Sequence, residues 1–347
     1  MKGDGPLEVG AGPIRTGCTV ILPRSHYVRQ NPVYAGSSRL NGNGEMTGLE
    51  WVRESGLLAT AIGLTNTHSV GTVRDALVAD EAAQGIAGKF WSMPVVGETW
   101  DGLLNDVDGQ HVTSSHVREA LASCESGPVL EGSVGGGTGM ICHEFKGGIG
   151  TSSRVVDVGD GRYTVGALVQ ANQGRRRELR IDGIPIGRFE EFEHIPIPYS
   201  LFDNGTGGPP AGSGSIIVVI ATDAPLLADQ CARLATRAAL GIGRVGAGTA
   251  DSSGDLAIAF ATGNDLPTEA YLPGIPHEIT VRTLTHQHID PLLEAAADAT
   301  EEAIVNAMLA ADSMVGRDGV TAHALDHEAL SSVLGTARCW PNARWTL

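Results

Sequence analysis

The hydrophobic and polar positions of this chain follow two periods. Between residues 256 and 261 the bulky Leu256, Ile258 and Phe260 alternate with alanines, which predicts a strand with one bulky and one very small face. The continuous apolar run at 216–226 predicts a strand that is covered on both faces. Two further apolar runs, at 18–24 and 57–65, predict two more buried strands. Alternating residues on both sides of Gly159-Asp160-Gly161 predict a β-hairpin.

A helical period occupies other parts of the chain. Asp290 and Pro291 are suited to the N-cap and first position of a long Ala-rich helix. Helices are predicted over 71–83, 113–123, 227–246 and 289–314, and the Gly- and Pro-rich stretch 202–215 is typical of a linker. The pattern favours a layered α/β protein with a strand-dominated interior.

Composition restricts the partners of this fold. The chain has 347 residues, 42% of them hydrophobic, which suffices for one large domain or two smaller ones. Its net charge of −16 repels phosphate backbones and anionic lipid but suits amine-bearing ligands, so we expect neither nucleic acid nor a membrane as partner. Because no apolar run has the length of a signal peptide or a membrane span, we expect a soluble cytoplasmic protein.

Motifs for metals and cofactors are incomplete. The five cysteines are scattered and form no CxxC pair. His323 and His327 have i,i+4 spacing but lack the Glu of H-E-x-x-H, so we interpret them as surface histidines. The glycines at 135–139 do not fit a dinucleotide fingerprint and predict a tight loop. We expect no metal and no cofactor.

A Ser-Ser-Gly turn, Ser252-Ser253-Gly254, directly precedes the alternating strand. Serine is a weak nucleophile that needs a base within hydrogen-bonding reach. Cutting the chain before Ser253 would supply one, because an α-amine titrates near 7.7–8.0. Gly254 would allow the unusual backbone angles of a strained turn. From the residues alone, an ordinary Ser/Gly turn remains the alternative.

Segments in all parts of the chain resemble the self-processing L-aminopeptidase/D-esterase-amidase family, which includes the β-peptidyl aminopeptidases. They include AIGLTNTHSVGTVRDAL, EGSVGGGTGMICHEFKGGIGTSSRVV, GSIIVVIATDAPLL, SSGDLAIAFATGN and ATEEAIVNAMLAADSMVGRDG. The resemblance implies an αββα sandwich similar to the N-terminal-nucleophile hydrolases with different connectivity. It also implies a single domain over 1–347, cut into associated chains 1–252 and 253–347, and a homo-oligomer. The expected substrates are small peptides and aminoacyl amides or esters.

The resemblance also assigns site residues. The cleaved bond would be Ser252–Ser253, with Ser253 as the nucleophile. The family's hydroxyl residue and Glu, two positions apart, correspond to Thr300 and Glu302. Such positions do not share a face of a regular helix, so either the helix is distorted or only one belongs to the site, and we favour Glu302. The position of a Tyr near the family's oxyanion is occupied by His143.

The remaining candidates rest on chemistry. Asn66 is a candidate side-chain donor to an oxyanion, and Glu131 a candidate receptor for the substrate's ammonium group. Backbone N–H groups of the 135–139 loop are further oxyanion donors. The expected reaction passes through an acyl-enzyme that water hydrolyses.

Two alternatives remain open at the level of sequence. One is an acyltransferase on the same scaffold. The other is an unprocessed, non-catalytic homologue, which would fit Ser252 in a place where relatives often have Gly or Asn. It would also fit a shortened start, since relatives usually carry an additional N-terminal segment.

Overall fold

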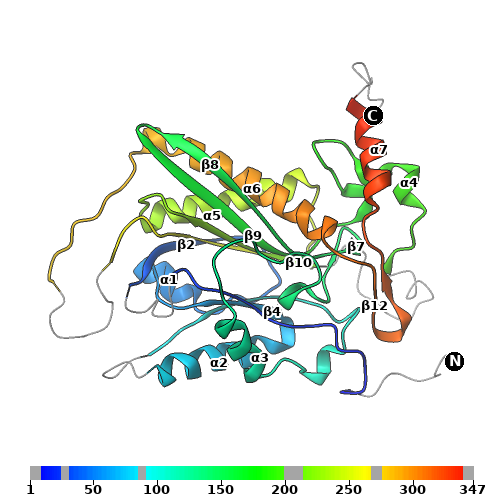
Figure 1. Ribbon diagram of the computed structural model, residues 1–347, viewed down its shortest axis with the longest axis horizontal. Coiled ribbons are helices and arrows are strands. Elements are labelled where there is room, and N and C mark those ends of the chain that lie inside the picture. Colours follow the sequence, from blue (N-terminus) through cyan, green and yellow to red (C-terminus); the bar gives the residue numbers. More distant parts are fainter. Residues whose placement is uncertain (1–8, 25–30, 85–90, 199–213, 267–275, 339–347) are drawn as a thin grey trace.

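The computed structural model describes residues 9–24, 31–84, 91–198, 214–266 and 276–338. They form a sandwich of four layers, helix–sheet–sheet–helix, in which two sheets pack face to face and a helical layer covers each outer face (Figure 1). The αββα architecture expected from the resemblance is confirmed.

The interior consists of two sheets. The smaller sheet has the order β1 (Thr19–Ile21), β4 (Ile62–Asn66), β5 (Val95–Thr99). The larger has the order β3 (Leu57–Leu58), β2 (Val33–Gly42), β11 (Gly254–Ala261), β10 (Ser215–Thr222), β9 (Gly161–Asn172), β8 (Gly148–Val158). In the larger sheet β10 and β11 are parallel and the other pairs are antiparallel. β11, which follows the Ser-Ser-Gly turn, lies between β2 and β10 and is therefore a central strand.

The helices cover opposite sides of this pair of sheets. α2 (Val70–Ala83) and α3 (Ser114–Ala122) pack on the smaller sheet, whereas α5 (Ala228–Arg244) covers β2 and β11 and α6 (Asp290–Leu309) covers β8 and β9. The shorter elements are α1 (Leu49–Ser55), α4 (Glu190–Glu193), α7 (His327–Arg338) and the two-stranded pairs β6 (Ile141–Cys142) with β7 (Phe145–Lys146) and β12 (Met314–Val315) with β13 (Thr321–Ala322).

The alternation in β11 is explained by its two neighbours. Leu256, Ile258 and Phe260 enter the core between the two sheets, while Ala257 and Ala259 face the helical layer. Small residues on that face let α5 approach closely, as the pattern indicated. The strand is buried along its whole length.

Some predicted elements need correction. The run at 57–65 is two strands, β3 and β4, which belong to different sheets because the chain turns at Ala59–Ala61. α6 has Ile289 at its N-cap, one residue before Asp290, and ends at Leu309 rather than at 314. Of the predicted linker at 202–215, only Gly214 and Ser215 lie within the described residues, and Ser215 begins β10.

Candidate active site

Ser253 lies in a turn at the entrance to β11. Its N–H donates to the carbonyl oxygen of Ala250 at 3.1 Å, so this nitrogen closes a turn and is not part of the sheet ladder. Its own carbonyl accepts the N–H of Asn43 at 3.1 Å. Only 3% of the residue is exposed. The sequence-predicted nucleophile is therefore buried and held in place by the backbone on both sides.

The hydroxyl of Ser253 has a carboxylate as its partner. Ser253 Oγ donates to Asp255 Oδ1 at 2.6 Å, and Asn41 Nδ2 donates to Asp255 Oδ2 at 2.6 Å. Burial raises the pKa of Asp255 above its ordinary value, against hydrogen bonds from Ser253, Asn41 and the N–H of Ile216. A desolvated carboxylate in contact with a hydroxyl is suited to act as a general base.

The carbonyl of the bond before Ser253 also has a side-chain partner. Asn43 Nδ2 donates to the carbonyl oxygen of Ser252 at 2.8 Å. Negative charge would develop on this oxygen if Ser253 attacked the Ser252 carbonyl, and an amide donor at this distance stabilises such a charge. The amide group of Asn43 therefore lies next to the oxygen on which this charge would develop.

Gly254 is required by crowding rather than by unusual backbone angles. A Cβ at this position would lie 2.7 Å from Gly44 Cα and against the carbonyl oxygen of Asn43. Its φ is outside the left-handed region, and no residue of the described turn 249–253 is left-handed either. The expectation of a strained turn at Gly254 was therefore wrong: the glycine lets the "NGNG" segment, residues 41–44, pass directly over the start of β11.

Sequence reasoning missed both Asn41 and Asn43. The two residues are more than 200 positions away from Ser253 and come next to it only because β2 pairs with β11, with Gly42 opposite Gly254. The available signal was the "NGNG" pattern itself, two amide side chains between glycines at the end of a strand.

Thr300 has other partners. Its hydroxyl donates to the carbonyl of Ala296 one turn earlier in α6, at 2.7 Å, and its Cβ faces Gly241 of α5. The residue is fully buried between the two helices. The hydroxyls of Thr300 and Ser253 are not bonded to each other: that of Thr300 donates to Ala296 and that of Ser253 to Asp255.

Glu302 lies on the side of α6 that faces β8. Its Oε2 accepts Ser152 Oγ at 2.9 Å and pairs with Arg154 at 2.6 Å. Burial is outweighed by these two partners, which hold the pKa of Glu302 below its ordinary value. β8 is three strands away from β11, about 14 Å at the usual spacing, so the carboxylate is separated from Ser253. In the continuous chain Glu302 is thus bound to Ser152 and Arg154, and its role as the partner of the amine stays a prediction.

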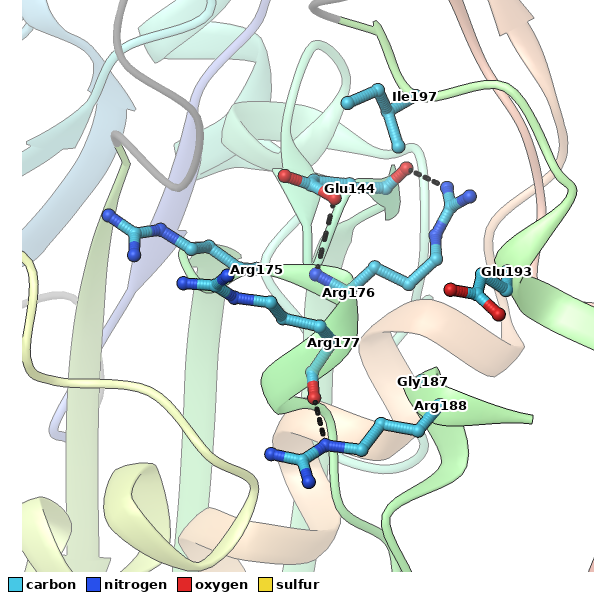
Figure 2. Close-up of a pocket in the computed structure, with 8 residues that line it drawn as sticks. All are labelled: Glu144, Arg175, Arg176, Arg177, Gly187, Arg188, Glu193 and Ile197. Atoms are coloured by element: carbon cyan, nitrogen blue, oxygen red, sulfur yellow. Dashed lines mark hydrogen bonds between the residues drawn. The ribbon is translucent and has the colours of Figure 1, made fainter. Parts of the chain in front are cut away.

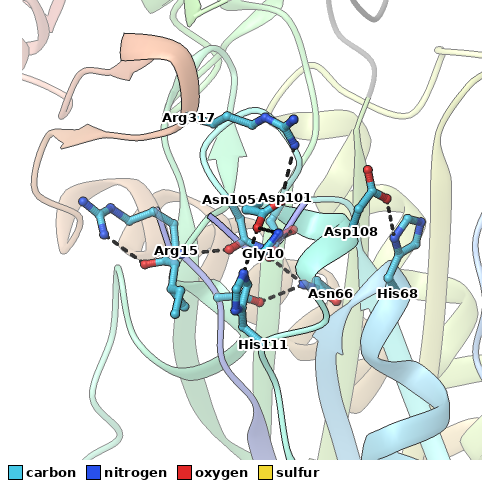
Figure 3. Close-up of polar contacts among 12 residues, drawn as sticks. Gly10, Arg15, Asn66, His68, Asp101, Asn105, Asp108, His111 and Arg317 are labelled. Carbon is cyan, nitrogen blue, oxygen red and sulfur yellow. Dashed lines mark hydrogen bonds and ion pairs between the residues drawn. The ribbon is translucent and has the colours of Figure 1, made fainter. Parts of the chain in front are cut away.

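Asn66 points into a different polar cluster. Its Nδ2 donates to Thr16 Oγ1 at 2.9 Å and to Asp101 Oδ2 at 3.0 Å (Figure 3). Both protons of this amide nitrogen are then in use, and none remains for an oxyanion. Burial raises the pKa of Asp101 to about 6, so Asn66 helps to hold a desolvated carboxyl group. In this structure Asn66 therefore bonds to Thr16 and Asp101, and its role as an oxyanion donor stays a prediction.

His143 is buried against Gly174, and its Nδ1 lies 3.1 Å from the carbonyl oxygen of Arg175. Burial lowers its pKa to about 4, so the ring is neutral at pH 7. A carbonyl partner requires a proton on Nδ1, which leaves Nε2 as an acceptor. His143 therefore cannot donate to an oxyanion from Nε2 in the way that a Tyr hydroxyl would.

Glu131 and the 135–139 loop, the other two candidates, also have hydrogen-bond partners within the protein. Glu131 Oε1 accepts the N–H and the hydroxyl of Thr151, each at 2.6 Å, at the outer edge of β8. In the 135–139 loop, the N–H groups of Gly136, Gly137 and Thr138 bond to Thr19, Val134 and Gly135. The tight-loop interpretation fits this geometry, and those three N–H groups are not free for an oxyanion.

His323 and His327 do not lie on the same element. His323 follows β13 and is not on the helix of His327, so the two are not helical neighbours. Across the residues that the structure describes, no group of three or more His, Cys, Asp or Glu side chains is placed to hold a metal ion. Within the same residues, no helix has the length and apolarity to cross a membrane.

Two cavities lie near the ends of the central strands. One, of about 430 Å³, is bordered by Gly42, Gly44 and Leu256, next to the Ser253 turn. The other, of about 680 Å³, is lined by Glu144, Arg175, Arg177 and Arg188 (Figure 2). In the second, Arg176 is tied to the carbonyl of Glu144 at 2.7 Å and lies over the ring of Phe145.

Known proteins with similar sequences are hydrolases. The model of peptidase family S58 matches residues 4–322. The β-peptidyl aminopeptidase BapA of Sphingosinicella microcystinivorans is 46% identical over 340 residues, which cover 96% of this chain and 83% of that protein. BapA of Sphingosinicella xenopeptidilytica is 41% identical, with the same coverage.

Solved structures agree in fold. A β-aminopeptidase of a Burkholderia species superimposes with a TM-score of 0.86 at 53% identity, covering 95% of this chain and 89% of that one. The L-aminopeptidase D-Ala-esterase/amidase of Ochrobactrum anthropi, described as a variant of the Ntn-hydrolase fold, gives a TM-score of 0.87 at 42% identity, covering 97% and 90%. These similarities favour hydrolysis over the acyltransferase and the non-catalytic alternatives.

Proposed function

This chain belongs to peptidase family S58 and is an aminopeptidase with an N-terminal serine nucleophile, and from this premise we propose that Ser253 is that serine. Self-cleavage of the Ser252–Ser253 bond would divide it into chains 1–252 and 253–347. The observation that carries the proposal is the pair of contacts around this bond, Ser253 Oγ to Asp255 and Ser252 O to Asn43.

The processing step uses groups that are present before cleavage. Asp255 accepts the proton of the Ser253 hydroxyl as Oγ attacks the Ser252 carbonyl carbon, and Asn43 holds the resulting oxyanion. The C–N bond then breaks, the proton passes to the Ser253 nitrogen, and an ester joins Ser252 to Ser253 Oγ. Water hydrolyses this ester and leaves Ser253 with a free α-amine.

In turnover the new amine takes over as base. It removes the hydroxyl proton while Oγ attacks the carbonyl of the substrate's first residue, and it returns the proton to the departing nitrogen. The acyl-enzyme is hydrolysed by water. Asn43 serves the substrate's oxyanion as it served that of Ser252.

Small peptides and aminoacyl amides or esters are the proposed substrates, including peptides that begin with a β-amino acid, since relatives are named for these reactions. The substrate amine needs an anionic partner. Glu98 is our candidate: it is buried on β5, its Oε1 accepts the N–H of Glu45, and it faces the same Gly44 that lies against Gly254. On the family resemblance, we also expect a homo-oligomer in the cytoplasm.

The test compares two neighbouring serines with two substrates. Wild type and Ser252→Ala should release p-nitroaniline from an aminoacyl p-nitroanilide, because only the backbone carbonyl of Ser252 takes part. Ser253→Ala should be inactive and remain one chain. N-acetylation of the substrate should abolish turnover. Activity in Ser253→Ala, or equal activity on the acetylated compound, would refute the proposal.

A further inference from the structure

The cavity of about 430 Å³ is next to the proposed nucleophile. Gly42, which lines it, is paired with Gly254, and Gly44 is so close that an added Cβ would lie 3.1 Å from Gly254 Cα. Leu256, three residues after Ser253, forms part of the wall. A substrate whose carbonyl reaches Ser253 therefore extends past this cavity.

The walls of this cavity combine apolar and charged side chains. Side chains from β11, from α1 and its approach, and from the segment before β5 surround it: Met46, Leu49, Trp51, Met93 and Leu256. Met93 is 41% exposed, so the cavity is open to solvent at this side. An aromatic or long aliphatic side chain matches such a lining.

Three arginines and one acidic residue, Glu50, line this cavity, although the chain as a whole has a net charge of −16. The arginines are Arg39, Arg53 and Arg74. Arg53 is paired with Glu50 and Arg74 with Asp75. No acidic side chain of the described residues lies within ion-pairing distance of Arg39, which leaves its guanidinium available to an anion.

We infer that this cavity binds the leaving residue of the substrate and that Arg39 recognises its carboxylate. This inference rests on the proposed function. The acyl residue of an aminopeptidase substrate carries an ammonium group, which Arg39 repels, whereas the leaving residue of a dipeptide carries a carboxylate that Arg39 attracts. The enzyme then prefers short substrates with an apolar C-terminal residue and a free carboxylate directly after the cleaved bond.

The register between β2 and β11 places Arg39 within reach of the carboxylate of the leaving residue. Arg39 is paired with Leu256, and Leu256 is three residues from Ser253, about 10 Å along an extended strand. A leaving residue spans about 2.5 Å between its nitrogen and its carboxyl carbon. The arginine side chain covers the remaining distance, and its planar fork matches a carboxylate.

The test compares β-alanyl-phenylalanine with its C-terminal amide. Wild type should cleave the free acid with the higher kcat/KM. Arg39→Gln should lower kcat/KM for the acid about tenfold, so that the ratio of acid to amide approaches one. Arg162→Gln, which removes one positive charge at the distant β8–β9 hairpin, should keep the wild-type ratio.

Binding gives a readout that needs no turnover. N-acetyl-phenylalanine should bind the wild-type protein more tightly than N-acetyl-phenylalanine amide in a calorimetric titration, and Arg39→Gln should remove the difference. Equal binding of acid and amide to wild type, or an equal loss of both in Arg39→Gln, would overturn the inference. If the chain still self-cleaves and hydrolyses the amide, the proposed function stands even when this subsite fails.

Discussion

At the scale of single residues, self-cleavage needs a base before the α-amine of Ser253 exists. Asp255 supplies it in this structure, because its carboxylate is 2.6 Å from Ser253 Oγ and is shielded from water. Asn41 holds the other oxygen of the same carboxylate. Processing and turnover thus share one nucleophile but use two different bases.

Asp255→Asn removes this first base without changing the size of the side chain. We expect self-cleavage to slow by about 10²- to 10⁴-fold, the usual contribution of a positioned general base. Asp251→Asn, a change at an exposed position in the same turn, should cleave at the wild-type rate. The measurement is the fraction of intact chain against time on a denaturing gel, and rapid cleavage of Asp255→Asn would contradict the assignment.

Asn43→Asp keeps the shape of the side chain but removes both amide protons. The loss of one oxyanion donor typically costs about 10²- to 10³-fold in rate, so uncut chain should accumulate and become available for purification. Intact chain is quantified by mass spectrometry directly after expression. Complete processing of this variant would show that Asn43 does not serve the oxyanion.

The pH dependence of processing follows from the raised pKa of Asp255. A protonated carboxyl group cannot accept the hydroxyl proton, so cleavage should be lost as the pH falls through this pKa, which lies above the ordinary value of about 3.9. Asn43→Ala lacks the same donor without adding a carboxyl group that titrates, so it should also accumulate uncut, and its cleavage rate can be measured from pH 4 to 8. A rate that rises on acidification would exclude a carboxylate base.

The sequence predicted Ser253 but not the groups around it, for a physical reason. Ser253 and Asp255 are close along the chain, whereas Asn41 and Asn43 reach the site through the register between β2 and β11, which local patterns do not reveal. The helical period did predict that Thr300 and Glu302 would not share a face of the helix. Two positions apart, one faces α5 and the other faces β8.

At the scale of elements, local signals located most helices and strands well. α2 and α5 match their predicted ranges within one or two residues, since caps and the 3.6-residue period are local. The run at 57–65 was different. Its apolar residues predicted burial correctly but could not tell that β3 and β4 belong to separate sheets, because each lies in a core.

The contact between α5 and α6 predicts opposite effects on stability for alanine substitutions at two glycines of α5. A Cβ at Gly241 would lie 2.7 Å from Thr300 Cβ and 2.8 Å from the carbonyl oxygen of Ala297, whereas a Cβ at Gly243 meets nothing within 4 Å. Gly241→Ala should lower the free energy of unfolding by about 1–3 kcal/mol through overpacking. Gly243→Ala should raise it by about 0.5–1 kcal/mol through helix propensity.

Both variants are compared by urea denaturation in the Ser253→Ala background, where the chain stays continuous. Equal stability of the two variants would contradict the close packing of α5 on α6.

At the scale of the whole molecule, the proposed cut leaves the fold connected. β11 lies between β2 and β10 of the larger fragment, and α6 packs on β8, β9 and α5. The smaller fragment therefore contributes a central strand and a covering helix. We expect the fragments to co-elute in size-exclusion chromatography in buffer and to separate only in denaturant, and separation in buffer would contradict this arrangement.

The account as a whole depends on the cut before Ser253, and the mass of the purified wild-type protein under denaturing conditions tests it most directly. The account predicts two species, one of residues 1–252 and one of 253–347 that begins with Ser253, and a single species for Ser253→Ala. A wild-type protein that has one mass, that of all 347 residues, while it releases amino acids at full rate would contradict it.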